Sequence, residues 1–138
     1  YTKFQENDLI WARITPCMQN GKSAIARKLV NGFGYGSTEY HVLRRKNERF
    51  SIVFAYHLLR TQTVLQDAIN YFTGSAGQQR VPKSYLENLL VPVPPLEKQK
   101  DIVTHLSNLK EKVKNLKEQA QQNRQDAITD FEKEIFKA

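Results

Sequence analysis

The chain has 138 residues, with 21 Lys and Arg against 14 Asp and Glu, and so carries a formal net charge of +7. This length allows one modest domain with an appendage, and the single cysteine, Cys17, excludes an intramolecular disulfide and favours a reducing, cytoplasmic location. No stretch approaches the ~20 apolar residues of a transmembrane helix, so we expect no membrane association.

The positive charge is concentrated in the first two thirds of the chain. Residues 1–93 hold 12 Lys and Arg against 6 Asp and Glu, a net of +6, whereas residues 94–138 hold 9 against 8, a net of +1. A domain with a strongly positive balance suits a polyanionic partner such as nucleic acid. The alternative is a mildly basic domain whose charge serves solubility alone.

Short strands joined by turns are expected in the first part of the chain. Residues 8–14 are rich in strand formers and favour a strand, with Trp11 as a core residue. Residues 16–23 form a loop around an Asn-Gly turn, and residues 23–30 favour a second strand or one helical turn. The glycine-rich residues 31–36 favour a turn, and residues 37–44 give the clearest strand.

Helices dominate the pattern after residue 50. Residues 50–61 and 64–72 have helical apolar spacing, and a polar, small-residue loop follows at residues 73–80. Ser84 and Glu87 have the spacing of a capping box, which predicts a short helix that begins at Ser84. Residues 90–93 suit an edge strand, because proline cannot donate a hydrogen bond inside a sheet. Residues 1–93 are therefore predicted to form a mixed α+β globular domain.

Three prolines, Pro92, Pro94 and Pro95, separate this domain from a second region, residues 94–138. Proline fixes its own φ and restrains the preceding residue to extended conformations, so the three form a stiff joint. Beyond them, residues 96–136 contain no Gly or Pro and predict one long helix, in which Glu97 favours the positively polarised first turn. At 1.5 Å per residue its ~41 residues reach about 60 Å.

The long helix carries the apolar spacing of a coiled coil. Its apolar positions recur at steps of 4-3-4-3-4, are interrupted by the polar residues 119–125, and resume one residue out of register. A seam of this length needs a second helix, from another chain or from a missing part of this one; the alternative is an amphipathic helix that lies on its own domain. The expected pairing residues are Ile102, Leu106, Leu109, Val113, Leu116, Ala120, Ile128, Phe131 and Ile135.

The sequence gives no sign of a catalytic site. The three histidines are scattered away from Cys17 and from carboxylates, so no metal site is expected. Neither a G-x-S-x-G elbow nor a phosphate-binding P-loop occurs, and the glycine run 32–36 lacks the strand–loop–helix context of a cofactor loop. We therefore expect neither a cofactor in this chain nor a stand-alone enzyme.

Four polar or basic loops are better candidates for DNA contacts. They supply hydroxyl groups, amides that can bond adenine, and guanidinium groups that can bond guanine or phosphate. Taken singly, each has a plainer interpretation as a solvated turn or loop. The candidate residues are Asn20, Lys22, Ser23, Tyr35, Ser37, Thr38, Arg44, Arg45, Lys46, Arg49, Gln78, Gln79 and Arg80.

The segment 90–103, LVPVPPLEKQKDIV, resembles the proline–glutamine segment that closes a target recognition domain in the specificity subunits of type I restriction–modification enzymes. Residues 36–44, GSTEYHVLR, resemble a strand of the same family, and residues 8–14, 20–22 and 77–81 match its neighbouring strand and loops. The chain departs at Lys98, where many members carry Glu. It also departs in size, because a full subunit carries two recognition domains and two spacer helices.

The resemblance implies that residues 1–93 would read one half of a split double-stranded DNA target. The helix would pair antiparallel with a counterpart, from a second recognition domain or a second copy, and would dock methyltransferase and restriction subunits. S-adenosylmethionine, ATP and Mg would belong to those partners. Two alternatives stay open: the recognition end of a fused restriction–methyltransferase, and a coiled-coil assembly adaptor without DNA specificity.

Overall fold

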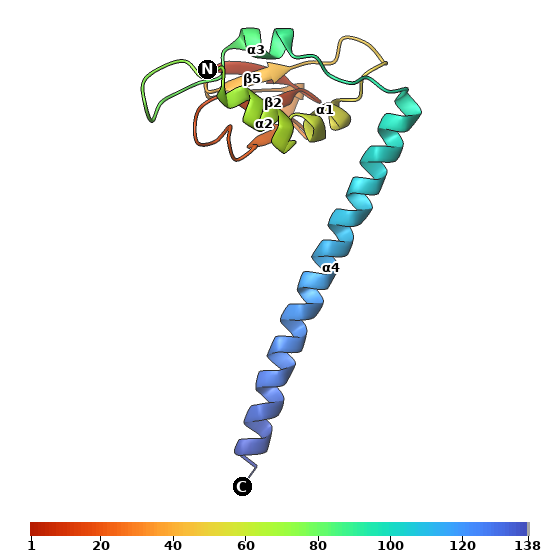
Figure 1. Cartoon of the computed structure of the whole chain (residues 1–138). Coiled ribbons are helices and arrows are strands. Elements are labelled where there is room, and N and C mark those ends of the chain that lie inside the picture. The colour runs from red at the N-terminus through yellow and green to blue at the C-terminus, as the bar shows by residue number, and fades with distance from the viewer. Residues whose placement is uncertain (138) are drawn as a thin grey trace. The chain divides into compact units, whose positions relative to one another are not determined.

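The computed structural model describes residues 1–137 and divides them into two compact units. The first unit, Tyr1–Lys100, contains all the strands, three helices and the first turn of a fourth helix, α4 (Leu96–Ile135). The second unit begins at Asp101 and continues α4 to its end (Figure 1). The mixed α+β domain and the long C-terminal helix are thus both confirmed.

Two small antiparallel sheets form the framework of the first unit. In one, β1 (Thr2–Gln5) pairs with β4 (Phe33–Gly36). In the other, β2 (Leu9–Ala12) lies between β3 (Ser23–Ile25) and β5 (Tyr40–Leu43). The central strand β2 is nearly all buried, as expected of a strand with partners on both edges and helices over one face.

The expected strands and turns are partly corrected. The predicted second strand over residues 23–30 is confined to β3, and a 3-10 turn, η1 (Val30–Gly32), follows it. Residues 33–36 form β4 instead of the predicted turn. A Cβ on Gly34 would lie 2.6 Å from the Phe4 ring. The glycines at this point therefore make room for an aromatic side chain on the neighbouring strand instead of marking a bend.

Two helices begin at residues whose side chains cap them. The Ser51 hydroxyl accepts a hydrogen bond from Phe54 N at the start of α1 (Ile52–Leu58). The Thr61 hydroxyl accepts one from Val64 N at the start of α2 (Gln62–Ile69). Such bonds satisfy amide groups that have no partner within the first helical turn.

The predicted start of the next helix is wrong. Helix α3 (Lys83–Asn88) is preceded by Pro82 and has no side-chain cap, so Ser84 lies inside the helix. Glu87 pairs with the Lys83 ammonium at 2.7 Å and does not complete a capping box. A backbone N–H at the start of a helix has no partner within the helix, so Pro82, which lacks an N–H, is tolerated there.

Residues 90–93 form no strand, which corrects the predicted edge strand. They instead lead in extended coil to α4, whose observed start at Leu96 confirms the sequence prediction. The first turn of α4 belongs to the first unit, since Gln99 is fully buried there.

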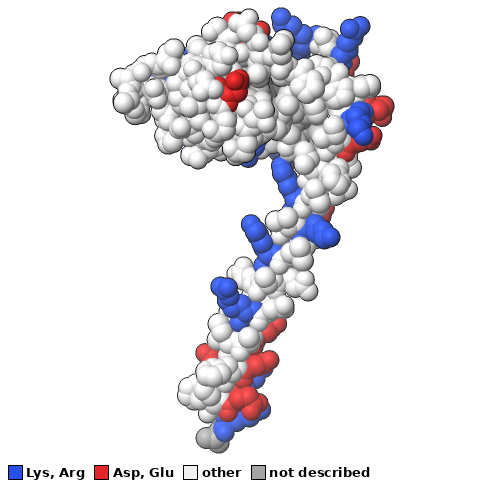
Figure 2. All heavy atoms as spheres, in the orientation of Figure 1, with Lys and Arg blue, Asp and Glu red and all other residues white. Residues whose placement is uncertain are grey.

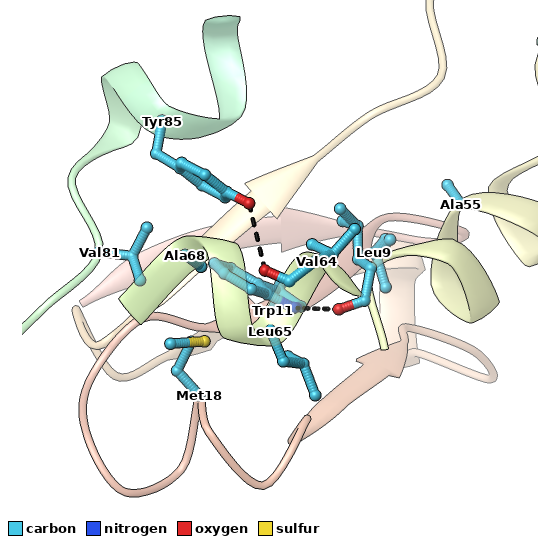
Figure 3. Close-up of a cluster of buried hydrophobic side chains, with 10 residues drawn as sticks. Leu9, Trp11, Met18, Ala55, Val64, Leu65, Ala68, Val81 and Tyr85 are labelled. Atoms are coloured by element: carbon cyan, nitrogen blue, oxygen red, sulfur yellow. Dashed lines mark hydrogen bonds between the residues drawn. The ribbon is translucent and has the colours of Figure 1, made fainter. Parts of the chain in front are cut away.

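A cluster of buried apolar side chains holds β2 against α1, α2 and α3 (Figure 3). Trp11 is fully buried, as predicted, and its indole N–H donates to Leu59 O at 3.2 Å. The Tyr85 hydroxyl donates to Val64 O, also at 3.2 Å. Both aromatic rings thus bury apolar area while their polar atoms remain paired. This core gives the loops around it a fixed base.

Candidate nucleic-acid interface

The pairing of β2 with its neighbours separates the candidate loops into two groups. Ala12 pairs with Tyr40 at one end of the three-stranded sheet, and Leu9 pairs with Leu43 at the other. Trp11 pairs with Ser23, so the turn before β3 lies at the Ala12 end. The candidates at residues 20–23 and 37–38 therefore share the Ala12 end of the sheet, whereas those at residues 44–49 leave from the Leu9 end.

The polar loop at residues 73–80 also meets the Ala12 end. Thr15 N donates to Gln79 O at 2.9 Å, and Val81 N donates to Arg13 O at 2.9 Å. On the other side of the same segment, Arg13 N donates to Glu39 O at 3.0 Å. The backbone of residues 13–15 thus lies between the loop after β4 and the loop before α3. The structure brings together three of the four candidate loops.

Arg80 and Glu39 form an ion pair across these two loops. The Arg80 Nε and Nη2 atoms donate to the Glu39 carboxylate at 2.7 to 3.1 Å, and Nη1 donates to Gln78 O at 2.6 Å. The guanidinium of Arg80 keeps the pKa of the Glu39 carboxyl below its usual value. Arg80 therefore has an internal partner that fixes the loop, and a DNA contact by this residue stays a prediction.

The polar tips of the loops are open to solvent. Ser37, Thr38 and Gln78 are exposed, and Gln79 is half-buried. The Ser37 hydroxyl accepts a hydrogen bond from Glu39 N at 3.1 Å, which holds the bend before β5. Hydroxyl and amide groups in this setting can bond phosphates or base edges.

The turn that carries Asn20 and Lys22 is held by an arginine from beyond α1. Arg60 Nη1 donates to Gly21 O at 2.8 Å, and the φ of +62° at Gly21 suits a residue without a Cβ. Ser23 O–H donates to the same carbonyl at 3.2 Å. Asn20 and Lys22 are exposed, so the turn presents an amide and an ammonium from a fixed backbone.

Two residues that the sequence did not single out accompany Tyr35 on β1 and β4. Tyr35 is 60% exposed and makes an edge contact with Phe33, with ring centroids 6.0 Å apart. The Lys3 ammonium lies 4.7 Å from the centre of the Phe33 ring. This arrangement arises because Lys3 pairs with Tyr35 across the two strands. The sequence pattern predicted a turn in place of β4, so this pairing could not be predicted from it.

The Leu9 end of the sheet has a different character. The Arg44 guanidinium forms two hydrogen bonds, of 2.7 and 2.8 Å, with the carboxylate of the buried Asp8. Arg45 pairs with Glu48 at the surface, and the side chains of Lys46 and Arg49 are exposed. Arg44 is therefore held by the buried Asp8, while residues 45–49, the basic turn, face solvent.

The charges are unevenly spread over both units. On the face shown in Figure 2 most of the surface of the first unit is uncharged, and Lys and Arg gather at its margins. Along α4 basic side chains are frequent, and acidic ones gather toward the C-terminal end, at Asp126, Asp130, Glu132 and Glu134.

The apolar residues of the predicted seam are open along most of α4. Ile102 and Leu106 are half-buried, whereas Leu109, Val113 and Leu116 are 46 to 54% exposed. After the polar interruption, Ile128, Phe131 and Ile135 are 47 to 64% exposed. Large apolar side chains thus lie exposed at regular helical spacing, as they would on a surface that binds another protein.

Comparison with known proteins now decides the family. Residues 1–124 match the family described as type I restriction modification DNA specificity domain. This chain belongs to that family. It is 37% identical over 120 residues to the EcoAI specificity subunit and 38% identical over 109 residues to the EcoEI specificity subunit, both type I restriction enzyme subunits of Escherichia coli.

The matched regions cover 87% and 79% of this chain but only 20% and 18% of those two relatives. The chain thus spans about a fifth of the length of the curated relatives it matches. The resemblance drawn from residues 36–44 and 90–103 is confirmed, and with it the interpretation as a DNA specificity domain.

Two further findings concern the described residues of this specificity domain. They contain no group of three or more His, Cys, Asp or Glu placed to hold a metal ion. Over the same residues, no helix combines the length and the apolar character needed to cross a bilayer.

Proposed function

We propose that this chain reads one half of a bipartite double-stranded DNA target, as a recognition domain of a type I specificity subunit. The observation that supports it best is the meeting of three polar loops at the Ala12 end of the sheet, around the backbone of residues 13–15. Their exposed amides, hydroxyls and ammonium rise from backbones that hydrogen bonds hold in place. Recognition needs such fixed donors, because ordering loops on binding costs free energy.

The candidate residues divide by chemistry and place. Gln78 and Gln79 suit base edges, since an amide can bond adenine with two hydrogen bonds. Lys22 and the exposed basic turn at Arg45, Lys46 and Arg49 suit phosphates, which carry no sequence information but supply affinity. Asn20, Ser23, Tyr35, Ser37, Thr38, Arg44 and Arg80 complete the proposed DNA-binding set.

In this proposal the chemistry is carried out by partner subunits in the cytoplasm. Methyl transfer from S-adenosylmethionine would occur in a methyltransferase subunit, and ATP- and Mg-dependent cleavage in a restriction subunit. The domain would comprise residues 1–93 and the spacer helix residues 94–138. A fused restriction–methyltransferase remains an alternative. Sequencing the gene that encodes this chain distinguishes the two, because a fused enzyme would encode a catalytic region in the same gene.

The proposal also includes an antiparallel partner for α4. The positions 109, 113, 116, 120, 124, 128, 131 and 135 lie on one face, with steps of 4-3-4-4-4-3-4. These steps are the same from either end, with their centre at residue 122. An antiparallel second copy centred there would place Leu109 against Ile135, Val113 against Phe131, and Leu116 against Ile128. The shift of register is therefore compatible with such a pair.

Charges support the antiparallel direction. Lys110 and Lys112 flank the apolar face near one end, and Glu132 and Glu134 flank it near the other. In an antiparallel pair centred at residue 122, Lys110 would face Glu132 of the second copy, and Lys112 would face Glu134. A parallel pair would bring like charges together at both ends, which is unfavourable. A homologous helix of a longer subunit could replace the second copy.

DNA binding is tested on the whole chain with fluorescent duplexes of mixed sequence at several salt concentrations. The proposal expects binding that weakens with salt, because neutralised phosphates release counterions. Methylation-site mapping of the cognate complex should then reveal a split motif. Helix pairing without any DNA binding would favour the assembly-adaptor alternative instead.

Cysteine cross-linking tests the helix direction. In a Cys17→Ser background, Leu109→Cys chains mixed with Ile135→Cys chains should form a disulfide, while Leu109→Cys chains alone should not. In a parallel pair the outcome reverses, because positions 109 and 135 are separated by about 39 Å along a helix. Non-reducing electrophoresis reads the result, and cross-linking of Leu109→Cys chains alone would contradict the antiparallel pair.

A further inference from the structure

We infer that Arg13, which the sequence did not indicate as a DNA contact, binds a phosphate of the DNA at the Ala12 end of the sheet. This inference rests on the proposed DNA-recognition function and names one contact within it. Its basis is a guanidinium whose buried Nε has no hydrogen-bond partner. Among the described residues, Arg13 Nε is the one fully buried side-chain nitrogen or oxygen without a hydrogen-bond partner.

Two other arginines of the domain have carboxylate partners. Arg44 forms two hydrogen bonds with the Asp8 carboxylate, and Arg80 forms three with the Glu39 carboxylate. A planar guanidinium fits a carboxylate in this two-pronged way. Arg13 has no such hydrogen bonds with a carboxylate, although it lies close enough to Glu39 for its charge to lower the pKa of that carboxyl.

The local charge leaves room for an anion. Arg13 and Arg80 are both positive, and Glu39 is the carboxylate between them, with both of its oxygens bonded to Arg80. Next to this group, His41 is largely buried and its Nε2 lies 2.8 Å from Val81 O. Burial lowers the pKa of His41, so the imidazole is neutral near pH 7. One positive charge therefore remains uncompensated, which suits one further oxygen anion.

The backbone of Arg13 is held on both sides. Its N–H donates to Glu39 O, and its carbonyl accepts from Val81 N. Arg13 thus lies at the base of the loops that present Thr38 and Gln78, in the segment that directly follows β2. A charged donor on a fixed backbone loses little conformational freedom when a ligand binds.

The position of Arg13 favours phosphate over a base edge. Base edges in the major groove lie about 8.5 Å deep, behind the rim of phosphates. Exposed loop tips can enter the groove, but a side chain whose Nε is buried at the base of these loops cannot extend that far. Arg13 as a whole is only half-buried, so a phosphate on the rim can approach the exposed part of its side chain while the loop tips contact the bases.

The contact predicts an unusual combination of effects. A buried donor without a partner destabilises the folded chain, so Arg13→Met should not lower the thermal midpoint. The same change should reduce the slope of log K against log salt by about 0.9, the value for one phosphate contact. The loss should be equal for duplexes of different sequence, because phosphates carry no sequence information.

The test compares the whole wild-type chain with three variants by fluorescence anisotropy on duplexes of mixed sequence. Arg27→Met is the matched control, because it removes the same charge from a different place. Arg27 is exposed and lies beyond β3, toward the Leu9 end of the sheet. Arg13→Lys keeps the charge and should keep the salt slope. We expect the smaller slope for Arg13→Met alone, with an unchanged or higher thermal midpoint.

The outcomes separate this inference from the function on which it rests. A wild-type chain that binds no duplex at low salt overturns the proposed function and the Arg13 contact together. Wild-type binding with the same slope for Arg13→Met and Arg27→Met overturns only the Arg13 contact. A lowered thermal midpoint for Arg13→Met, together with an unchanged slope, would show a purely structural role and would also overturn it.

Discussion

The side-chain amide of Gln99 accepts a hydrogen bond from Ser51 N at 2.8 Å and so joins the first turn of α4 to the residue that caps α1. The same amide donates to Arg49 O and to Pro94 O, each at 2.8 Å. Gln99 is fully buried, and only a neutral amide can both accept and donate at these three places. The basic turn and the first turn of the helix are therefore fastened by one side chain.

We predict that Gln99→Ala lowers the free energy of unfolding by about 1–3 kcal/mol, because it leaves buried backbone groups unpaired. Gln99→Glu should cost at least as much, since a carboxylate cannot donate to the two carbonyls. Urea denaturation at pH 7 measures both. Gln121→Ala, an exposed change on α4, is the control. If Gln99→Ala behaved like this control, the three bonds would contribute nothing to stability.

The sequence predicted the parts of the fold whose signals are local. Trp11 in the core and the start of α4 at Leu96 follow from strand-forming residues and from the prolines before the helix. The strand β4 was missed because its glycines resemble a turn, while their actual reason is the Phe4 ring on another strand. Leu90, expected in an edge strand, is 96% exposed in extended coil instead.

The candidate interface shows the same limit. Loop composition indicated the residues at the Ala12 end, but only the strand pairing shows that three of the loops meet there. The unpaired Nε of Arg13 depends on contacts that form in the folded domain, so no local pattern reveals it. Likewise the ion pairs of Arg44 and Arg80 join residues 36 and 41 positions apart.

The buried Asp8 carboxylate should make the domain sensitive to acid. Its bonds with Arg44 hold the pKa of Asp8 below the ordinary value of 3.8. As the pH falls through the ordinary pKa of an aspartate, the carboxyl takes up a proton in the unfolded chain before it does so in the folded chain. The stability that the ion pair gives at neutral pH is therefore lost progressively, until the pH lies below the lowered pKa of the folded chain. We predict that Asp8→Asn lowers stability by about 1–3 kcal/mol at pH 7 and flattens this acid dependence.

Urea midpoints of both chains between neutral pH and about pH 3 test this linkage. Asp101→Asn serves as the control, because Asp101 is an exposed carboxylate on α4. Equal slopes against pH for the wild type and Asp8→Asn would mean that the ion pair does not govern acid stability.

The two ends of the sheet should affect DNA binding differently. Replacing Gln78 and Gln79 with Ala should cost about 1–3 kcal/mol of discrimination between the target and a mismatched duplex, with an unchanged salt slope. Replacing Arg45 and Lys46 with Ala should reduce the salt slope by about 1.8 and leave discrimination unchanged. Anisotropy titrations on both duplexes separate the effects. If the glutamine pair altered only the salt slope, base contacts by that loop would be excluded.

A charge exchange on α4 tests which side chains meet in the proposed pair. Lys110→Glu with Lys112→Glu places acid opposite Glu132 and Glu134 of a second copy, so this variant should pair more weakly with itself. Glu132→Lys with Glu134→Lys should do the same through repulsion of lysines. Mixing the two variants should restore pairing, because in each mixed pair both ends join acid to base.

A single chain that carries all four exchanges should also pair as strongly as the wild type, because each end again meets the opposite charge. Sedimentation equilibrium at low salt measures all of these species. Exposed ion pairs contribute only about 0.2–1 kcal/mol each, so the differences should shrink in high salt as screening increases. Recovery in the fourfold variant is the decisive result. If that chain pairs no better than the twofold variants, the helices do not meet in the register centred at residue 122.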